Sequence, residues 1–342
     1  MPSAESERRA QRSPGCISSN LRHIDGPMID IHHHISPPRY TEVVGAQFNS
    51  RNPANAANIL GWTPSRSIEA MDASGIAAAV TSISTPGVWL GDVLLARRLA
   101  RECNEYAARM TNDYPGRFGF FATVPMPDLD STLDEIRYAF DVLGADGVGL
   151  MSNYGSVWPG DPSLAPVLDE LNRRSAIVYV HPILPVACAG MMAGVGESAL
   201  EYLFDTARAI ASLLYNGSFI RWPNIRFIFP HAGGALPPLA ERVSRMADRD
   251  RRIDGKPAVG SLREIKQLYF DVATSTNPVT MAGLLRLASI DRIMFGTDFP
   301  FVSSMSYTID PLRSYGLAAA DLHAVESGNA RRLFSRFSQS AG

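Results

Sequence analysis

Residues 28 to 34 read MIDIHHH, a short apolar run that ends in three histidines. The run from Met28 to Ile31 predicts a buried β-strand, because apolar side chains dominate it. Side chains alternate between the two sides of a strand, so His32 and His34 are predicted to point one way and His33 the other. Two imidazoles on one side can hold a metal ion, with neutral nitrogens about 2.1 Å from zinc. A polar histidine cluster on a loop is the alternative interpretation.

Seven more short apolar runs follow, separated by longer amphipathic stretches, and this alternation is typical of repeated βα units around a parallel sheet. The predicted strands are Met28 to Ile31, Ala77 to Ser82, Arg117 to Thr123, Gly147 to Leu150, Ala176 to Val180, Arg226 to Phe229, Leu268 to Val272 and Arg292 to Phe295. The predicted helices are Ser65 to Ala73, Leu94 to Asn112, Ser131 to Leu143, Ser163 to Arg173, Ala199 to Gly217, Leu236 to Ala247, Pro278 to Leu287 and Leu322 to Phe337. Eight strands, each followed by a helix, predict a closed (β/α)₈ TIM barrel rather than an open doubly wound sheet.

Several boundary residues support these helices. Ser65 stands at the start of the first helix, and Asp161 and Pro162 precede the fourth. Gly75 and Gly144 stand where two helices are predicted to stop.

Five of the seven histidines fall immediately after predicted strands. His181 follows the fifth strand, His231 the sixth, and Asp298 follows the eighth. Active sites of such barrels lie at the carboxyl ends of the strands, so these side chains are predicted to meet the His32 and His34 pair there. Taken singly, His181 also fits a core histidine, His231 a helix cap and Asp298 a turn cap. The order of all five favours a metal site. The glycine pair after His231, at 233 and 234, is predicted to let the backbone approach a ligand closely.

Lysine is nearly absent from the chain, which has only Lys256 and Lys266. Both lie far from the fourth predicted strand, so no lysine there can form a carbamate that bridges two metals. We therefore predict one divalent ion. Three histidines and one aspartate suit Zn²⁺ best, with Mn²⁺ as the alternative and Fe²⁺ or Co²⁺ also chemically acceptable.

Composition predicts an ordinary soluble enzyme. The chain has 342 residues, 19% of them charged, and a formal charge of -2, which gives no pull toward nucleic acid or membrane surfaces. Cys16, Cys103 and Cys188 show no CxxC spacing, which indicates a reducing compartment, and we predict the cytoplasm. Residues 1–27 are predicted to be a flexible arm and 28–342 a single domain. No apolar run reaches membrane-spanning length, and no glycine motif for nucleotides ends a strand.

The sequence resembles the amidohydrolase superfamily, and within it the amidohydrolase-2 branch that includes aminocarboxymuconate semialdehyde decarboxylase and aromatic acid decarboxylases. The motifs that carry this resemblance are IDIHHH at 29–34, GVGLMSNYG at 147–155, YVHP at 179–182, FIFPHAGGALP at 227–237, MFGTDFP at 294–300 and GNARRLF at 328–334. The stretches YGSVWPGDP at 154–162 and ELNRR at 170–174 look similar to 6-methylsalicylate decarboxylase-like members.

The resemblance implies that His32, His34, His181 and Asp298 bind the metal and that His231 is the catalytic histidine. It also implies a dimer in which Arg242 reaches the substrate carboxylate in the neighbouring subunit, and we predict a homodimer or homotetramer. A second substrate-binding arginine of the family has no clear match, although Arg39 and Arg51 are candidates.

We therefore predict a metal-dependent, non-oxidative decarboxylase of a small hydroxyaromatic or related unsaturated carboxylic acid. His231 would deliver a proton to the ring, and Asp298 would be both a ligand and a proton relay. Four aromatic residues on the predicted rim are candidates to stack on the ring of the substrate: Tyr154, Trp158, Trp89 and Phe299. Hydrolysis of a lactone or amide by metal-activated water is the alternative, since it uses the same ligands. A non-catalytic metal-binding scaffold on the same fold is the third hypothesis.

Overall fold

A computed structural model describes residues 28–51, 53–192, 194–253 and 256–338. The predicted arm at 1–27 lies outside these ranges. Within them, no helix has both the length and the apolar character needed to span a bilayer.

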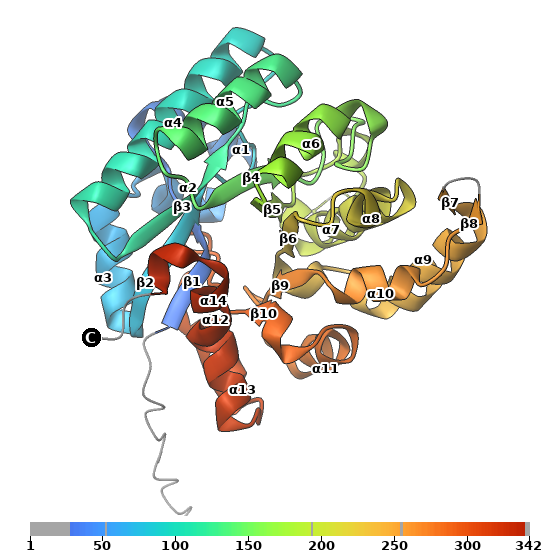
Figure 1. The fold of residues 1–342 in the computed structure, drawn as a ribbon. Helices are drawn as coiled ribbons and strands as arrows, with labels where there is room; N and C mark the ends of the chain where they lie inside the picture. The colour runs from blue at the N-terminus through green and yellow to red at the C-terminus, as the bar shows by residue number, and fades with distance from the viewer. Residues whose placement is uncertain (1–27, 52, 193, 254–255, 339–342) are drawn as a thin grey trace, which may run out of the picture.

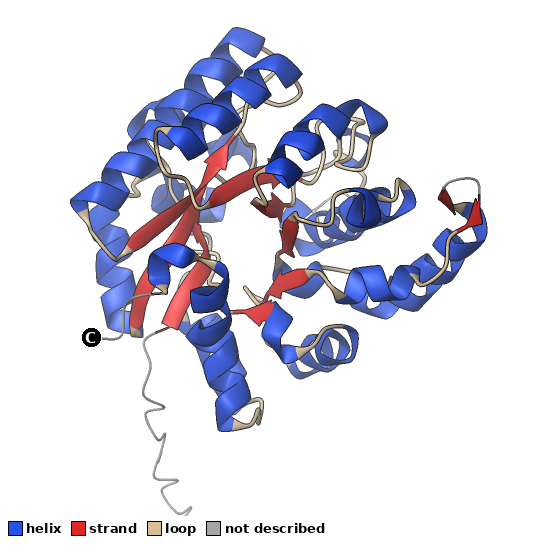
Figure 2. Cartoon of the chain, viewed as in Figure 1, coloured by secondary structure: helices blue, strands red, loops and turns tan. Residues whose placement is uncertain are grey.

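Eight parallel strands form a ring with helices outside it, as Figures 1 and 2 show. The strands follow one another around the ring in the order of the chain: β1 (Met28–His34), β2 (Ile76–Ser82), β3 (Phe118–Thr123), β4 (Gly147–Met151), β5 (Ile177–His181), β6 (Arg226–Phe229), β9 (Tyr269–Asp271) and β10 (Ile293–Met294). Backbone hydrogen bonds from Ile31 N–H to Phe295 O (3.0 Å) and from Asp298 N–H to His32 O (2.8 Å) join the last segment to the first. The predicted (β/α)₈ TIM barrel is confirmed.

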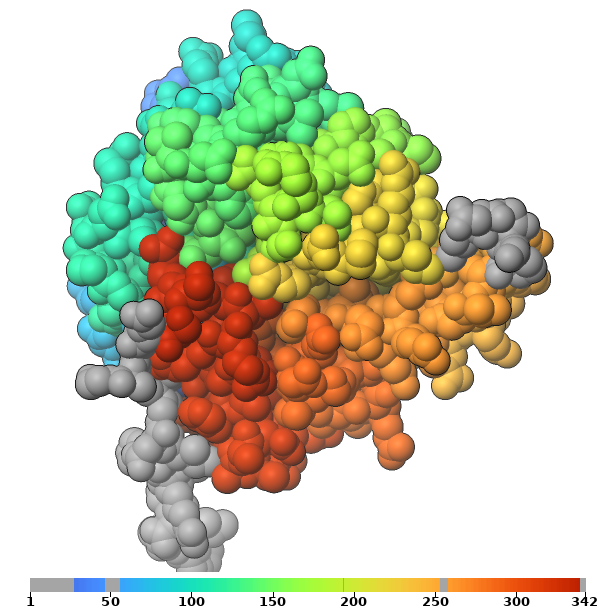
Figure 3. Space-filling view, viewed as in Figure 1, coloured from blue at the N-terminus to red at the C-terminus, as the bar shows by residue number. Residues whose placement is uncertain are grey.

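The strands form because their side chains are buried on both faces. Inward-pointing apolar side chains meet inside the ring, and outward-pointing ones pack under the helices. The barrel interior comprises Ile29, Ile31, Ala78, Val80, Phe121, Ile177, Tyr179, Ile228 and Met294. Figure 3 shows from the same side that atoms cover the centre of this face.

The outer layer consists of the longer helices that connect the strands, together with several short ones. These are α1 (Pro38–Arg51), α2 (Pro53–Leu60), α3 (Pro64–Ser74), α4 (Val93–Asp113), α5 (Leu129–Asp141), α6 (Ala165–Arg173), α7 (Glu197–Tyr215), α8 (Ser218–Arg221), α9 (Leu236–Asp250), α10 (Ser261–Lys266), α11 (Pro278–Leu287), α12 (Ser306–Ser314), α13 (Ala319–His323) and α14 (Asn329–Leu333). A small antiparallel pair, β7 (Arg252–Ile253) and β8 (Lys256–Pro257), follows α9.

The helix boundaries agree in part with the predictions. Helix α3 starts one residue earlier than predicted, because the Thr63 side chain accepts a hydrogen bond from the N–H of Arg66 and so caps the helix. Gly75 ends this helix in the left-handed conformation at φ 71°, as predicted. Helix α5 stops at Asp141, before Gly144.

The C-terminal segment differs from the single helix predicted at 322–337. It consists of α13, a π-helical turn (Ala324–Gly328), α14 and a final 3₁₀ turn (Ser335–Phe337). The Nδ2 group of Asn329 donates to Ile290 O (2.7 Å) and Ile293 O (2.6 Å), which ties the segment to the start of β10. Phe334 and Phe337 then pack with the barrel interior. The helix breaks because these contacts turn the chain across the amino-terminal end of the barrel.

Candidate active site

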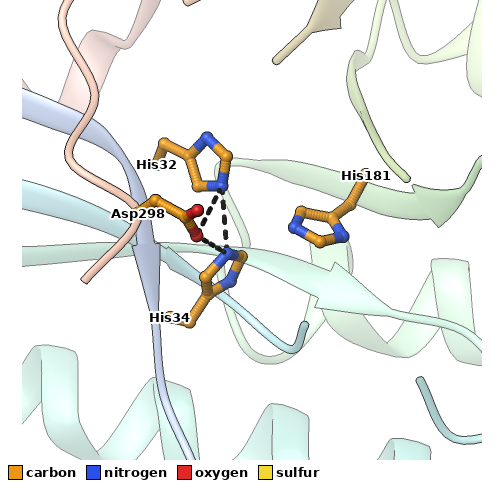
Figure 4. Close-up of side chains that lie close together, drawn as sticks. All are labelled: His32, His34, His181 and Asp298. Carbon is orange, nitrogen blue, oxygen red and sulfur yellow. Dashed lines mark hydrogen bonds and ion pairs between the residues drawn. The ribbon is translucent and has the colours of Figure 1, made fainter. Parts of the chain in front are cut away.

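Four side chains from three places in the chain meet at the carboxyl-terminal end of the barrel. His32 and His34 come from β1, His181 ends β5 and Asp298 follows β10. Each offers one ligand atom, and these atoms all lie within 4.8 Å of one another. Nε2 of His32 lies 3.0 Å from Nε2 of His34, and Oδ1 of Asp298 lies 3.3 Å and 3.2 Å from these two nitrogens. Figure 4 shows His181 pointing at the same space from the opposite side.

The hydrogen bonds behind these residues show that the cluster fits a cation. Nδ1 of His32 lies 3.1 Å from Oδ2 of Asp271, and Nδ1 of His34 lies 3.0 Å from Oγ of Ser82. With Nδ1 of each neutral imidazole donating outward, both Nε2 atoms present lone pairs to each other and to Asp298. Nδ1 of His181 is buried without a hydrogen-bond partner among the described residues. Several acceptors facing one another need a cation between them.

The pKa values of the residues in the cluster also agree with a cation site. Burial by itself lowers the pKa of His32, but the carboxylates of Asp271 and Asp298 outweigh it and raise that pKa to about 10. Burial and the neighbouring imidazoles hold the pKa of His181 well below its usual value. Burial would raise the pKa of Asp298, but the histidines around it hold that pKa well below its ordinary range. The carboxylates of Asp271 and Asp298 therefore favour a positive charge beside them, and the lowered pKa values of His34 and His181 favour neutral imidazoles.

Asp271, at the end of β9, is a functional residue that the sequence interpretation missed. Besides His32, its carboxylate accepts hydrogen bonds from the hydroxyl of Tyr179 (3.0 Å), the N–H of His231 (3.2 Å) and the N–H of Ala273 (2.9 Å). The signal was present, because an acidic residue inside the apolar run YFDVA must be buried with partners. Asp271 fixes the ring of His32 and the backbone of His231 together.

Gly296 makes this arrangement possible. A Cβ atom at this position would lie 2.7 Å from Cβ of His32 and 3.3 Å from Cγ of Asp271. The first distance is too short for any side chain. The glycine therefore leaves the room that the His32 and Asp271 pair occupies.

His33 points away from the cluster, as predicted. Its Nδ1 lies 3.0 Å from Oδ2 of Asp30, its Nε2 lies 2.9 Å from Oγ of Ser67, and its ring stacks on Phe299 at 4.8 Å between centroids. Asp30 also accepts hydrogen bonds from the N–H (3.0 Å) and the hydroxyl (2.6 Å) of Thr297. This second buried network joins β1 to the loop that carries Asp298.

His231 lies beside the four-residue cluster rather than in it. Its ring centroid is 4.9 Å from that of His32, and its Nε2 is 3.5 Å from Oδ2 of Asp298. Its buried Nδ1 has no hydrogen-bond partner among the described residues. His231 has a φ of 54° and Asp298 has a φ of 67°, a left-handed conformation that non-glycine residues seldom adopt. Strain of this kind concentrates at functional sites.

The glycine pair after His231 serves the packing of the barrel. A Cβ at Gly234 would lie 2.3 Å from the carbonyl oxygen of Leu203, and one at Gly233 would lie 2.9 Å from the ring of Phe270. The backbone at the two glycines therefore lies close to α7 and β9.

His181, His231 and Asp298 line one cavity of about 380 Å³, which we call the metal cavity. The rest of its lining consists of Ser84, Thr85, Ser198, Ala199, Tyr202, Leu203, Thr274, Ser275, Phe301, Val302 and Tyr307. Among these described lining residues there are many hydroxyl groups and no lysine or arginine. Polar parts of a ligand would therefore face hydroxyls, imidazoles and the cation site.

The four aromatic residues predicted to stack on a substrate lie elsewhere. Trp89 and Tyr154 line a neighbouring cavity. The Nε1–H group of Trp158 donates to Oδ1 of Asp205 (3.0 Å), and Phe299 stacks on His33. None of the four lines the metal cavity.

Arg242 and Arg39, two of the predicted arginines, are not among the residues that line the metal cavity. Arg242 is exposed on α9 and forms no ion pair with any residue that the structure describes. Arg39 pairs with Glu42 (2.7 Å) on α1. The side chain of Arg51 lies outside the described part of the chain.

The fold and this site define a class of protein: a TIM barrel with a His₃Asp metal site at the carboxyl ends of its strands. Residues 29–336 match the Amidohydrolase family model. The chain belongs to this family, as its motifs predicted.

Relatives of known name support the same branch. The 6-methylsalicylic acid decarboxylase of Penicillium expansum is 33% identical, and the match covers 90% of this chain and 96% of that protein. The 6-methylsalicylic acid decarboxylase acuB of Aspergillus aculeatus is 36% identical over 80% of this chain and 84% of its own length.

A solved structure shares the fold. The 5-carboxyvanillate decarboxylase of Novosphingobium aromaticivorans, in complex with manganese and 4-hydroxy-3-methoxy-5-nitrobenzoic acid, superposes with a TM-score of 0.83 at 22% identity. The superposition covers 92% of this chain and 97% of that one.

Proposed function

We propose that this chain is a metal-dependent carboxy-lyase that removes CO₂ from a small hydroxylated aromatic acid without oxidation. One observation carries the proposal: the metal site and His231 face the same hydroxyl-lined cavity, in a chain whose relatives are named decarboxylases. Substrates of the 2-hydroxybenzoate type fit this arrangement, because a carboxylate and an adjacent hydroxyl can be held together at one cation.

The reaction needs a proton at the ring carbon that bears the carboxylate. We assign this proton transfer to His231, whose backbone is fixed by Asp271 and whose Nε2 faces Asp298. Once the carbon is protonated, the bond to the carboxylate breaks, its electron pair returns to the ring, and CO₂ leaves. A divalent ion held by the four residues of the cluster would orient the carboxylate and the adjacent hydroxyl and would stabilise their negative charge.

We propose His32, His34, His181 and Asp298 as the ligands of a single ion. The donor set favours zinc, and manganese is the alternative. Manganese is also the ion in two structural neighbours, both at 22% identity. Metal analysis of the purified protein distinguishes the two ions.

Assembly into a homodimer or homotetramer is part of the proposal, with Arg242 of one subunit contacting the substrate carboxylate in another. The metal cavity, as far as it is described, holds no cationic side chain of its own chain, so a partner arginine would complement the acid. We keep the cytoplasm as the proposed compartment. Cys103 and Cys188, the cysteines within the described ranges, are free thiols.

The test is to incubate the metal-loaded protein with a panel of hydroxybenzoates and a panel of lactones and amides. We expect CO₂ release from at least one 2-hydroxybenzoate and no acid release from the lactones or amides. Acid release without CO₂ would assign the chain to the hydrolases, and no turnover of either panel by stoichiometrically loaded protein would contradict the proposal.

A further inference from the structure

A second cavity of about 260 Å³ lies in the mouth of the barrel beside the metal cavity. Thr123, Gly149 and Met151 contribute to it from the ends of β3 and β4. Thr123 and Gly149 are paired across these strands, and Met151 is paired with His181 of the metal cavity. Adjacent strands lie roughly 4.8 Å apart, so the two cavities flank neighbouring strands. We call the second one the apolar cavity.

Two loops continue from one cavity into the other. Ser84 and Thr85 line the metal cavity, and Val88 and Trp89 of the same loop line the apolar cavity. After β5, His181 lines the metal cavity and Leu184 the apolar cavity. The two cavities are therefore built on the same two loops at the mouth of the barrel.

The chemistry of the two cavities differs. Among the residues that the structure describes, those lining the apolar cavity include no charged one, and most of them are apolar. Two of its polar side chains already bind within the protein: Nδ2 of Asn153 donates to Ile183 O (3.1 Å) and to Asp205 (2.8 Å), and the hydroxyl of Tyr154 accepts the N–H of Met151 (3.0 Å). Such a cavity recognises hydrocarbon rather than polar groups.

The wall of the apolar cavity is fixed from behind. The carboxylate of Asp205, on α7, is fully buried and accepts hydrogen bonds from Ser152, Asn153 and Trp158 (3.0 Å). These bonds anchor the loop that follows β4. A cavity held open in this way costs a ligand little ordering on binding.

The size of the apolar cavity suits part of a molecule. Sites for whole ligands usually measure about 300 to 1,000 Å³, and this one is smaller. Gly149 keeps it open. A Cβ at this position would make only ordinary contacts, 3.7 Å from Cβ of Phe121 and 3.8 Å from the carbonyl oxygen of Ala122. A longer side chain there would extend into the cavity.

From these observations we infer that the apolar cavity binds an alkyl substituent on the ring of the aromatic acid, with Gly149 setting the size that is accepted. This inference rests on the proposed function and adds the substrate class. It makes Gly149 and Trp89, which line two different walls, determinants of specificity.

The test uses 2-hydroxybenzoates with hydrogen, methyl or propyl at ring position 3, 4, 5 or 6. With the wild-type protein we expect one ring position of the substrate at which each methylene of the alkyl group that becomes buried raises kcat/KM about fourfold. In Gly149→Val, the ratio of kcat/KM for the propyl compound to that for the unsubstituted acid should fall roughly tenfold or more at this position. Gly149→Ala should lie between wild type and Gly149→Val.

Gly45→Ala is the matched control, because a Cβ there also makes ordinary contact, 3.6 Å from Leu60, on the outer helix α1. Gly45→Ala should leave the ratio of kcat/KM for the propyl compound to that for the unsubstituted acid unchanged. If Gly149→Val does not fold, Trp89→Ala is tested in its place. This substitution should enlarge the cavity and so raise the ratio of kcat/KM for the propyl compound to that for the methyl compound. The inference is overturned if wild type accepts no alkyl group at any position, or if neither wall substitution changes the ratios. Absence of CO₂ from every compound with wild type would instead contradict the proposed function.

Discussion

Nδ1 of His32 lies 3.1 Å from Oδ2 of Asp271, and both side chains are fully buried. Asp271 is not one of the four proposed metal ligands, but this contact orients the ring of His32, which is one of them. Hydrogen-bond partners behind a ligating histidine typically change metal affinity by roughly 10- to 100-fold. Asp271→Asn should therefore weaken metal binding by about this factor, measured by competition with a chelator of known affinity.

The control for this variant is Asp205→Asn, which changes another fully buried carboxylate outside the metal cluster. It should bind metal as tightly as wild type. An unchanged metal affinity in Asp271→Asn, with the fold intact, would show that the contact has no part in metal binding.

His231→Asn should keep the metal and lose turnover. His231 lies beside Asp298 and His32, and a positioned general acid contributes about 10² to 10⁴ in rate. We expect kcat to fall by this order, with KM changed less. Metal content and unfolding temperature must be measured on the same sample, since a destabilised barrel would mimic a catalytic defect. Turnover near the wild-type rate with full metal would make His231 a structural or binding residue.

His33→Ala should cost stability and leave the metal in place. The substitution removes the partner of Oδ2 of Asp30 and of Oγ of Ser67, and it opens a space against Phe299. We expect the free energy of unfolding to fall by about 2 to 4 kcal/mol, measured in urea. His323→Ala, at an exposed position, should change it by less than about 0.5 kcal/mol. Loss of stoichiometric metal from folded His33→Ala protein would contradict this assignment.

Glu170 gives a prediction about pH. Hydrogen bonds from Arg173 and from Arg174 (2.6 Å) lower the pKa of Glu170 to about 2, although burial alone would raise it. Because the folded pKa lies below the unfolded value of 4.5, the stabilisation is complete above pH 4.5 and is lost as the pH falls toward 2. Glu170→Gln should lower the free energy of unfolding at pH 7 by about 1 to 3 kcal/mol.

The difference between wild type and Glu170→Gln should shrink when urea unfolding is repeated at pH 3. Glu241→Gln, which changes an exposed carboxylate, should differ from wild type by less than about 0.5 kcal/mol at either pH. A Glu170→Gln effect that is equal at pH 7 and pH 3 would rule out the ionised carboxylate as its source.

The barrel and its cluster were predictable because both follow from local patterns. Apolar runs buried on two faces identify strands, and His32, His34, His181 and Asp298 stand within or directly after such runs. The carboxyl ends of parallel strands meet, so residues far apart in the sequence were expected at one place.

What could not be predicted depends on contacts between distant segments. Trp158 looked like a rim aromatic, but its indole donates to Asp205, 47 residues later in the chain. The ring of Phe299 stacks on His33, and the backbones of these two residues pair where the last segment of the barrel meets β1. Local sequence patterns contain no information about such pairings. Asp30 and Asp271 are different, since a carboxylate inside an apolar strand already signals a buried partner.

The central claim is that one ion held by His32, His34, His181 and Asp298 supports decarboxylation. Its most direct test is to titrate metal-free protein with Zn²⁺ or Mn²⁺ and to follow CO₂ release from a 2-hydroxybenzoate that the wild type accepts. We predict that the rate rises linearly and levels off at one equivalent per chain, and that Asp298→Ala neither binds the ion nor releases CO₂. A plateau at two equivalents, or undiminished CO₂ release without metal or by Asp298→Ala, would contradict the account.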